Sequence, residues 1–280
     1  MSRVFQALEK AEQEKKLRGK EDQPVQSFET KAVLKKEVAT LKFPEPKAEE
    51  FALPLKEEAP VLIVPSHSFA GEEFRKLKAQ IFQKLPNPPH TILVTSAAPG
   101  EGKTMVAVNL AMAISQEIQR KAILVDADLR KPSIHLDRSP GAKGLVNYLS
   151  DGTGLSEILI DSEMENLKII MAGPSSNKSS ELIGSKKMGE FLKSLHESED
   201  NSYVIIDSPP IISTTEPILL SKMVDGIVFV VMADRTPKQS VSRSIKSIDR
   251  QKIIGVVFNQ IDLKPTSYYS KYYYRYYRKY

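Results

Sequence analysis

The 280-residue chain contains no cysteine, which excludes disulfide bonds, thiolate metal sites and thiol nucleophiles and is consistent with a reducing cytoplasm. It also lacks an apolar run approaching the roughly 20 residues that a membrane-spanning helix needs. Its first residues turn polar at once, unlike those of a signal peptide. From these absences we expect a cytoplasmic protein that reaches a membrane only through a partner chain.

Acidic residues are absent from the end of the chain. After Asp262 the charged residues are all basic, namely Lys264, Lys271, Arg275, Arg278 and Lys279. These five account for the whole net charge of +5, because the rest of the 40 basic residues balance the 35 acidic ones. The basic character therefore belongs to this tail and not to a surface of a domain, and we expect no nucleic-acid partner.

Composition and patterning divide the chain into three parts. Residues 1–65 hold a short predicted helix, typical of either a solvated segment or a docking helix, and a charged linker with recurring prolines. Residues 66–262 alternate regularly between apolar runs and helical stretches, and the 41% hydrophobic content of the chain is enough for a core. Residues 263–280 lack any pattern that would build a core, so we predict a disordered, exposed tail.

The middle part has the pattern of an α/β domain. Strands are predicted at Thr91–Thr95, Ala122–Asp126, Leu167–Met171, Tyr203–Asp207, Gly226–Val231 and Ile253–Phe258. Helices are predicted at Phe69–Lys84, Lys103–Gln119, Ser180–His196, Pro217–Met223 and Thr236–Arg250. Strands that are apolar on both faces and separated by helices predict a doubly wound, mostly parallel sheet. Ligands of such sheets bind at the carboxyl ends of the strands.

A phosphate-binding loop directly follows the first predicted strand. Residues 97–104, AAPGEGKT, match G-x-x-x-x-G-K-[ST] except for Ala97 in the first glycine position, where a small alanine suits the close approach. In a P-loop NTPase the backbone N–H groups surround the phosphates, Lys103 reaches the β- and γ-oxygens of ATP, and the Thr104 hydroxyl ligates Mg2+. The residues expected to contact the nucleotide are Ala98, Pro99, Gly100, Glu101, Gly102, Lys103, Thr104 and Met105.

Aspartates end two later strands. The run AILVDADLRKP places Asp126 and Asp128 at the mouth of the second strand, and YVIIDSPP ends in Asp207, as a Walker B magnesium ligand does. A lone aspartate at a strand end is more typical of a turn or a helix cap. Three carboxylates that converge on one lysine–threonine loop instead favour a metal-assisted site for phosphoryl transfer.

These motifs resemble the bacterial tyrosine kinase (BY-kinase) family over about Ser66–Tyr280. The matching features are the PGEGKT loop, ILVDADLRKP, IIDSPP, the helix at Glu72–Lys78, Thr236-Pro237 and the tyrosine-rich end. The resemblance implies a Mg·ATP-dependent autokinase that regulates synthesis or export of exopolysaccharide, and SRVFQALEKAE weakly matches its stand-alone members.

The resemblance also implies roles for individual residues. The metal ligands would be Thr104, Asp128 and Asp207, and the catalytic group would be Lys103, Asp126 and Asp128. Asp126 is the usual candidate for accepting the tyrosine proton, although the division of roles between Asp126 and Asp128 stays open. A tyrosine hydroxyl has a pKa near about 10, so a carboxylate or the field of a metal must assist it.

The tail would be the substrate of the kinase. Its tyrosines are Tyr268, Tyr269, Tyr272, Tyr273, Tyr274, Tyr276, Tyr277 and Tyr280. Fully extended, residues 263–280 span roughly 55–60 Å, enough to reach the site of a neighbouring subunit. A basic tail rich in tyrosine is alternatively suited to bind anionic lipid, polysaccharide or nucleic acid.

The resemblance names partners as well. It implies a ring-shaped homo-oligomer built on a helix of pattern E-x-x-R-x-x-R, for which this chain offers Glu72, Arg75 and Lys78. Lysine at the last position keeps the charge but loses the bidentate fork of arginine, and the same residues also suit a solvated helix face with i,i+3 pairs. Further partners would be a membrane adaptor of the polysaccharide co-polymerase type, at the inner face of the cell membrane, and a cognate phosphotyrosine phosphatase.

Two other functions fit parts of the sequence. A partition or division-site ATPase acting on DNA or membrane would carry the signature K-G-G-x-G-K-T, but Ala98 stands where its early lysine would be. A degenerate scaffold that binds nucleotide without turnover would not need an intact site, whereas Lys103, Thr104 and all three aspartates are present.

Overall fold

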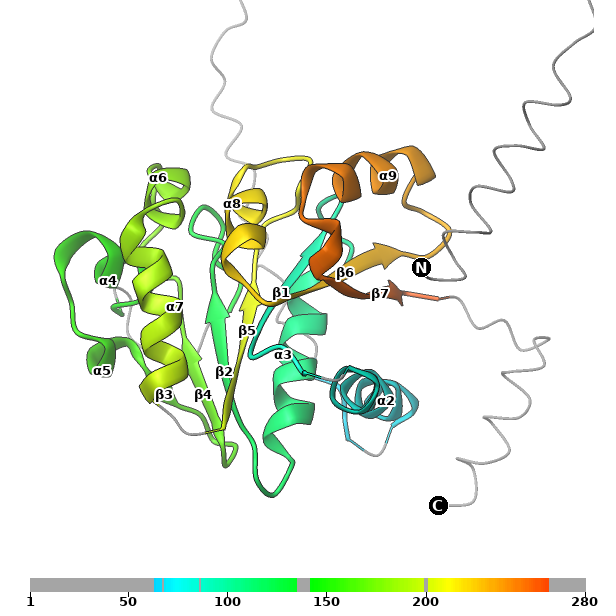
Figure 1. The fold of residues 1–280 in the computed structure, drawn as a ribbon, viewed down its shortest axis with the longest axis horizontal. Coiled ribbons are helices and arrows are strands. Elements are labelled where there is room, and N and C mark those ends of the chain that lie inside the picture. The colour runs from blue at the N-terminus through cyan, green and yellow to red at the C-terminus, as the bar shows by residue number, and fades with distance from the viewer. Residues whose placement is uncertain (1–62, 67, 86, 135–141, 199–200, 262–280) are drawn as a thin grey trace, which may run out of the picture. The chain divides into compact units, whose positions relative to one another are not determined.

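One seven-stranded sheet organises the part of the chain that the computed structural model describes, residues 63–66, 68–85, 87–134, 142–198 and 201–261 (Figure 1). The strands are β1 (Thr91–Ser96), β2 (Lys121–Asp126), β3 (Ile160–Asp161), β4 (Leu167–Ile170), β5 (Ser202–Asp207), β6 (Gly226–Met232) and β7 (Ile253–Asn259). Their order is β3-β4-β2-β5-β1-β6-β7, and every neighbouring pair is parallel except β3 and β4.

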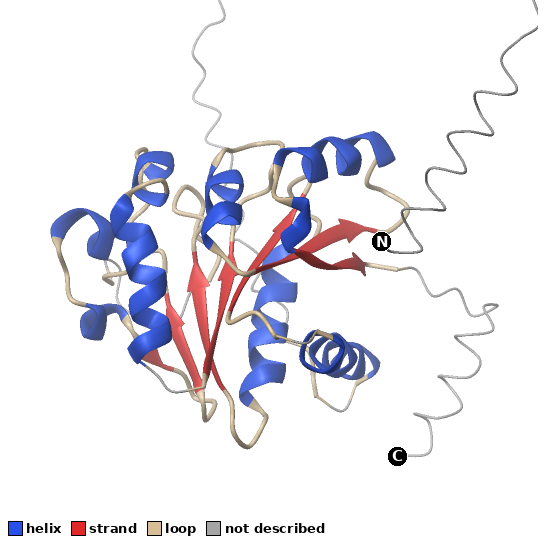
Figure 2. Ribbon diagram, viewed as in Figure 1, coloured by secondary structure: helices blue, strands red, loops and turns tan. Residues whose placement is uncertain are grey.

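Helices cover both faces of the sheet (Figure 2). They are α2 (Phe69–Lys84), α3 (Lys103–Ser115), α4 (Leu145–Asp151), α5 (Leu155–Ile158), α6 (Ser179–Ile183), α7 (Lys186–Ser198), α8 (Glu216–Met223) and α9 (Lys238–Ser247), with a 3-10 turn at Arg250–Lys252. Apolar side chains of α2 and α3 form one core with one face of the sheet, and those of α4, α7, α8 and α9 form a second core with the other. This arrangement confirms the predicted doubly wound α/β fold.

Local sequence explains how the first elements form. The helix α2 begins after Ser68, whose hydroxyl oxygen accepts a hydrogen bond of 3.1 Å from the N–H of Gly71, as a helix N-cap does. Its apolar residues, with Ile81 fully buried, pack towards the sheet and α3. The central strand β5 is buried along its whole length, because it has helices on both sides.

The helix predicted at Ser180–His196 is instead two helices, α6 and α7. Gly184 ends α6, and its N–H donates a 2.8 Å bond back to the carbonyl of Ser180. The Ser185 hydroxyl then accepts the N–H of Met188 at 3.2 Å and caps α7. A continuous helical pattern concealed this break because the apolar spacing resumes after it.

Two other helices are shorter than predicted, namely α3 and α9, which spans Lys238–Ser247 rather than Thr236–Arg250. The helix α3 ends at Ser115 rather than Gln119, and the Ser115 hydroxyl bonds the carbonyl of Met112 at 3.0 Å in its last turn. The sequence patterns also missed α4, α5 and β3, each of which is shorter than the stretch over which a hydrophobic pattern can be recognised.

The prediction of an N-terminal helix and linker, and that of the tyrosine tail, fall outside the described residues. All described residues belong to one unit of the chain, residues 56–280. Among them, no helix has both the length and the apolar character needed to cross a membrane.

Candidate active site

Three neighbouring strands bring the predicted motifs to one edge of the sheet. The strand β5 lies between β1 and β2. In the register of the sheet, Asp207 at the end of β5 pairs with Val94 of β1 on one side and with Asp126 of β2 on the other. The phosphate-binding loop leaves β1 immediately beyond this point. The convergence predicted for the loop, Asp126 and Asp207 is therefore present in the structure.

The phosphate-binding loop has the backbone that its glycines allow. Gly100 and Gly102 have φ of 79° and 86°, in the left-handed region that strongly favours glycine. The helix α3 starts at Lys103, so its first N–H groups face the loop and carry the partial positive charge of a helix N-terminus. Ala97, in the first glycine position, is fully buried at the start of the turn.

A buried carboxylate holds this loop in shape. Glu101 is only 2% exposed, and its side chain accepts the N–H of Ala98 at 2.8 Å and the hydroxyl of Thr236, which follows β6. Its backbone carbonyl accepts a 2.9 Å bond from the side-chain nitrogen of Asn259, at the end of β7. The side chain of Glu101 thus joins the loop to the residue Thr236 beyond β6, and its backbone carbonyl joins the loop to the end of β7. The expected contact of Glu101 with the nucleotide stays a prediction.

Asp126 organises the segment that follows β2. One carboxylate oxygen accepts the N–H of Asp128 at 3.0 Å, and the other accepts the N–H groups of Ser133 and Ile134, both at 3.0 Å. The side chain is fully buried. Burial raises the pKa of Asp126 to about 6, although the three backbone hydrogen bonds act in the opposite direction.

Asp207 is the least satisfied group at the site. It is completely buried, and neither carboxylate oxygen has a hydrogen-bond partner of ordinary geometry among the described residues, although the Thr104 hydroxyl is near enough to lower the pKa of Asp207. Burial raises the pKa of Asp207 to about 7, against the opposing charge of Lys103. Burial also raises the pKa of Asp128, which accepts the N–H of Lys131 at 3.0 Å and again feels the charge of Lys103.

This donor set fits Mg2+ held together with a nucleotide. Buried carboxylate oxygens without partners need a cation or donors, and Mg2+ is usually held by one or two carboxylates together with phosphate oxygens and water. The Thr104 hydroxyl lies 3.2 Å from that of Ser133, so a second hydroxyl adjoins the predicted ligand. Within the described ranges no group of three or more His, Asp or Glu side chains is placed to hold a metal by itself.

Comparisons with known proteins agree with this geometry. A family model described as an AAA domain matches residues 90–254. The tyrosine-protein kinase YwqD of Bacillus subtilis is 30% identical over 209 residues, which are 73% of this chain and 87% of that protein. The chain belongs to the bacterial tyrosine kinase family. The succinoglycan biosynthesis transport protein ExoP of Rhizobium meliloti is 31% identical over 218 residues, 75% of this chain but 27% of ExoP.

A solved structure also resembles this member of the tyrosine kinase family. The crystal structure of the chimerical protein CapA2B2 is 32% identical to it, with a TM-score of 0.64 over 69% of this chain and 86% of that one.

Two cavities of about 450 and 640 Å³ lie away from the aspartates and the phosphate-binding loop, near the starts of β2 and β1, and none of the motif residues lines them. The site of interest is therefore the open edge where the P-loop and the aspartates meet.

The helix that carries the predicted ring interface, α2, presents two different environments. Glu72 and Arg75 bond each other on the surface, with 34% and 39% of their side chains exposed. Lys78 points to α3 instead, where its ammonium group lies 2.7 Å from a carboxylate oxygen of Glu117 and the side chain is 12% exposed. Burial lowers the pKa of Lys78, and the charges of Arg120 and Arg75 add to this effect.

Sequence patterns did not single out every residue that shapes the kinase-family site. Ser133, Asn259 and Glu216 carry no local signal, because each acts through contacts that are distant in the sequence. The family resemblance singles out Thr236 but gives it no role. In the structure its hydroxyl donates a hydrogen bond to Glu101, so Thr236 helps to hold the phosphate-binding loop.

Proposed function

We propose that this chain is an ATP-dependent protein-tyrosine autokinase that phosphorylates the tyrosines of residues 268–280. The observation that carries the proposal is the meeting of a P-loop with Asp126 and Asp207 on adjacent strands, in a chain whose relative YwqD is named a tyrosine-protein kinase. The P-loop supports nucleotide binding, and the eight tyrosines of the tail supply acceptors on the same molecule.

The chain's own residues would hold the phosphates in place. Backbone N–H groups of residues 100–104, at the N-terminus of α3, would surround the β-phosphate, and Lys103 would reach the β- and γ-oxygens. Pro99 has no N–H, and the N–H of Ala98 is already donated to Glu101. Thr104 and Asp207 would hold Mg2+, with Asp128 assisting. The metal supplies neutralisation of the charge that develops on the transferred phosphoryl group. The charge of Lys103 acts to lower the pKa of both Asp128 and Asp207, which supports this assignment.

Phosphoryl transfer then requires the acceptor oxygen to lose its proton. We propose that Asp126 accepts this proton. Burial raises the pKa of Asp126 to about 6, which reduces the difference between its pKa and that of the tyrosine hydroxyl. The bond between the tyrosine oxygen and the γ-phosphorus forms as the bond to the β,γ-bridging oxygen breaks. ADP leaves with that oxygen, and phosphotyrosine is the product.

The tail would be presented to a neighbouring subunit in a ring, with Glu72 and Arg75 of α2 at the interface. Each phosphate adds about −1.5 to −2 charges, so a few phosphotyrosines would reverse the charge of a tail with five basic residues. This reversal of charge is a physical basis for switching between ring and monomer. An oligomer whose size is unchanged after exhaustive phosphorylation would exclude such a switch.

We place the kinase at the inner face of the cell membrane, bound to an adaptor of the polysaccharide co-polymerase type and opposed by a phosphotyrosine phosphatase. Support comes from the family and from the name of the relative ExoP, a succinoglycan biosynthesis transport protein. The regulated process would be synthesis or export of exopolysaccharide.

Incubation with Mg·ATP, followed by phosphotyrosine detection and mass mapping, tests the proposal. We expect label on the tail and none on Tyr148 or Tyr203, which lie in the folded domain. Lys103→Met should lower the label by about a hundredfold or more, Asp126→Asn should lower it too, and deletion of residues 264–280 should abolish it.

Mixing full-length Lys103→Met with the chain that lacks residues 264–280 but keeps its active site tests transfer between subunits. An unlabelled protein that binds DNA or membranes in response to ATP would instead support a partition-type ATPase.

A further inference from the structure

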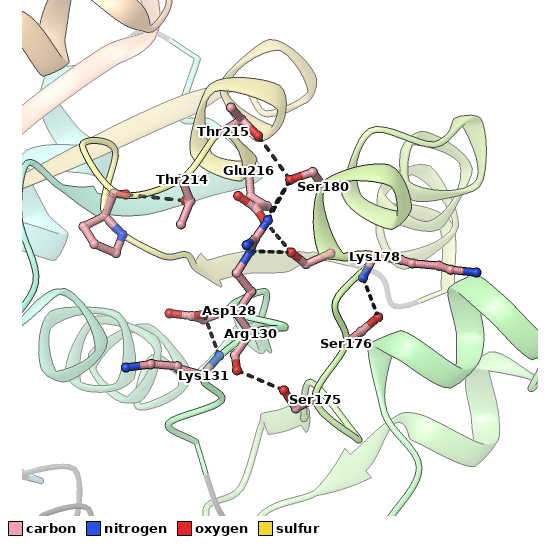
Figure 3. A network of polar contacts seen from close by, with 12 residues as sticks. Asp128, Arg130, Lys131, Ser175, Ser176, Lys178, Ser180, Thr214, Thr215 and Glu216 are labelled. Atoms are coloured by element: carbon pink, nitrogen blue, oxygen red, sulfur yellow. Dashed lines mark hydrogen bonds and ion pairs between the residues drawn. The ribbon is translucent and has the colours of Figure 1, made fainter. Parts of the chain in front are cut away.

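A polar network lies beside Asp128, on the segment that joins β2 to the rest of the domain (Figure 3). The N–H of Ser176 donates to the carbonyl of Leu129 at 2.9 Å, and the Ser175 hydroxyl donates to the carbonyl of Arg130 at 3.0 Å. With the bond from the Lys131 N–H to Asp128, these contacts fix the backbone directly after the metal-site carboxylate.

The side chain of Arg130 extends from this segment to two helices. Its Nε donates at 2.8 Å to both the Ser179 hydroxyl and a carboxylate oxygen of Glu216, and its Nη2 donates to the Ser180 hydroxyl at 3.2 Å. Figure 3 shows Arg130 lying between Ser180 of α6 and Glu216 of α8. One guanidinium group therefore joins the segment of Asp128 to both helices.

Glu216 is a buried and permanently charged partner. Its side chain is 1% exposed, and its second oxygen, Oε2, has no hydrogen-bond partner among the described residues. Burial alone would raise its pKa, but the hydrogen bonds from Ser179 and Arg130 outweigh burial and bring the pKa of Glu216 to about 2. The charge of this carboxylate depends on contacts made by Oε1.

The positions of Arg130 and Glu216 in the chain show which parts of the site their ion pair connects. Glu216 is the first residue of α8, the helix reached by the loop that leaves Asp207, and Arg130 follows Asp128 by two residues. The pair thus connects the two segments that carry Asp128 and Asp207. Only Glu216 is buried, because 49% of the Arg130 side chain is exposed. Ion pairs add little net stability in either environment, so a role in geometry accounts better for this one.

We propose that Arg130 and Glu216 are positioning residues that set the spacing of Asp128 and Asp207, and thereby the affinity of the nucleotide site for a divalent cation. The inference rests on the proposed function, in which these two aspartates serve Mg2+. Neither Arg130 nor Glu216 touches the metal or the substrate. They act on the carboxylates through the backbone, as outer partners do in other metal sites.

The test compares ADP binding with and without Mg2+. Fluorescence titration with N-methylanthraniloyl-ADP is run in Mg2+ and in EDTA, and urea unfolding is followed on the same samples. The double variant Arg130→Met/Glu216→Leu removes both charges together, so that neither is left buried and unpaired. The exposed pair on α7, replaced as Lys186→Met/Glu190→Leu, is the matched control.

We expect the double variant to bind ADP in EDTA at the wild-type level, while the gain in affinity from Mg2+ falls about tenfold or more. The control should keep the full gain. A double variant that retains the gain, or that loses affinity equally in Mg2+ and EDTA, would overturn the positioning role alone. A wild-type protein without any gain would overturn the metal site and the pair together. Arg130→Lys, which keeps the charge but loses the fork, should show the same selective loss and decides the matter if the double variant does not fold.

Discussion

The side-chain amide of Asn259 occupies the space that a Cβ on Gly102 would need, and its nitrogen donates a 2.9 Å hydrogen bond to the carbonyl of Glu101. The end of β7 is therefore in direct contact with the phosphate-binding loop. Gly100, two residues earlier, has nothing within 4 Å of the corresponding position. Gly100 is therefore required only for its backbone conformation. Gly102 is required both for its backbone conformation and for the space that a Cβ would take from Asn259.

Substituting these glycines separates the two demands. Both Gly100→Ala and Gly102→Ala carry the strain of a left-handed backbone, about 1–2 kcal/mol each, but only the second meets Asn259. We expect Gly102→Ala to lose clearly more ATP affinity than Gly100→Ala in calorimetric titrations. The double variant Gly102→Ala/Asn259→Ala should recover part of the loss. Equal losses from the two single variants would contradict the steric role of Asn259.

The bond between Thr236 and Glu101 predicts a loss of stability on removal of one hydroxyl. Thr236→Val keeps the shape of the side chain but leaves a buried carboxylate with one partner fewer, at a cost of about 1–3 kcal/mol in the free energy of unfolding. Thr236→Ser keeps the hydroxyl and should stay close to wild type in urea unfolding. ATP affinity should fall in step with stability, because the carboxylate of Glu101 also bonds the N–H of Ala98.

The raised pKa values at the site predict how stability depends on pH without metal. Asp126 and Asp207 have pKa values of about 6 and about 7 in the folded protein, above the value of about 3.9 in an unfolded chain. The folded state therefore binds protons more tightly, and this contribution to stability is lost as pH rises from about 4 to 7. In EDTA, we expect the free energy of unfolding to fall between pH 5 and pH 8.

Two variants check the origin of this slope. Asp207→Asn should flatten it and raise stability at pH 8, whereas Asp161→Asn, at a side chain 87% exposed, should leave it unchanged. Saturating Mg·ADP should reverse the trend, because the bound metal favours the ionised carboxylates. A slope that survives in both Asp207→Asn and Asp126→Asn would show that other groups are responsible.

The two environments on α2 predict opposite behaviour for Arg75 and Lys78. Lys78→Glu places two acids together between α2 and α3 and should lower the free energy of unfolding, and the exchange Lys78→Glu/Glu117→Lys should restore much of it. Arg75→Gln breaks a half-exposed pair with Glu72 and a bond to the carbonyl of Ser66 without adding a like charge, and should change stability by about 1 kcal/mol or less. If α2 forms the ring interface, the same variant should reduce oligomer size in analytical ultracentrifugation. An unchanged size would exclude Arg75 from the interface.

The motifs were predictable because each depends on a local pattern. A buried strand that ends in a glycine-rich loop or in an aspartate can be recognised from consecutive residues. Parallel strands place their carboxyl ends at one edge of the sheet. Lys103, Asp126 and Asp207 therefore converge as the sequence predicts. The family resemblance added the expectation of a tyrosine substrate, which the spacing of residues in the domain does not predict.

The contacts that shape the site were not predictable in the same way. Glu101 belongs to the loop by position, but its burial follows from Thr236 and Asn259, which arrive from β6 and β7. Similarly, an exposed arginine after a strand gives no sign that it will meet Glu216 on α8. Short elements such as α5 were missed for another reason, because four residues are too few for a hydrophobic repeat to be recognised.

The unpartnered carboxylate of Asp207 also bears on the history of the chain. Most substitutions that relieve a buried, unsatisfied charge stabilise a protein, and random change accumulates wherever activity is not under selection. A scaffold that had abandoned turnover would gain stability by replacing this aspartate with asparagine or an apolar residue. The chain carries the less stable choice at the centre of its sheet, as we expect where a metal ion is to be bound.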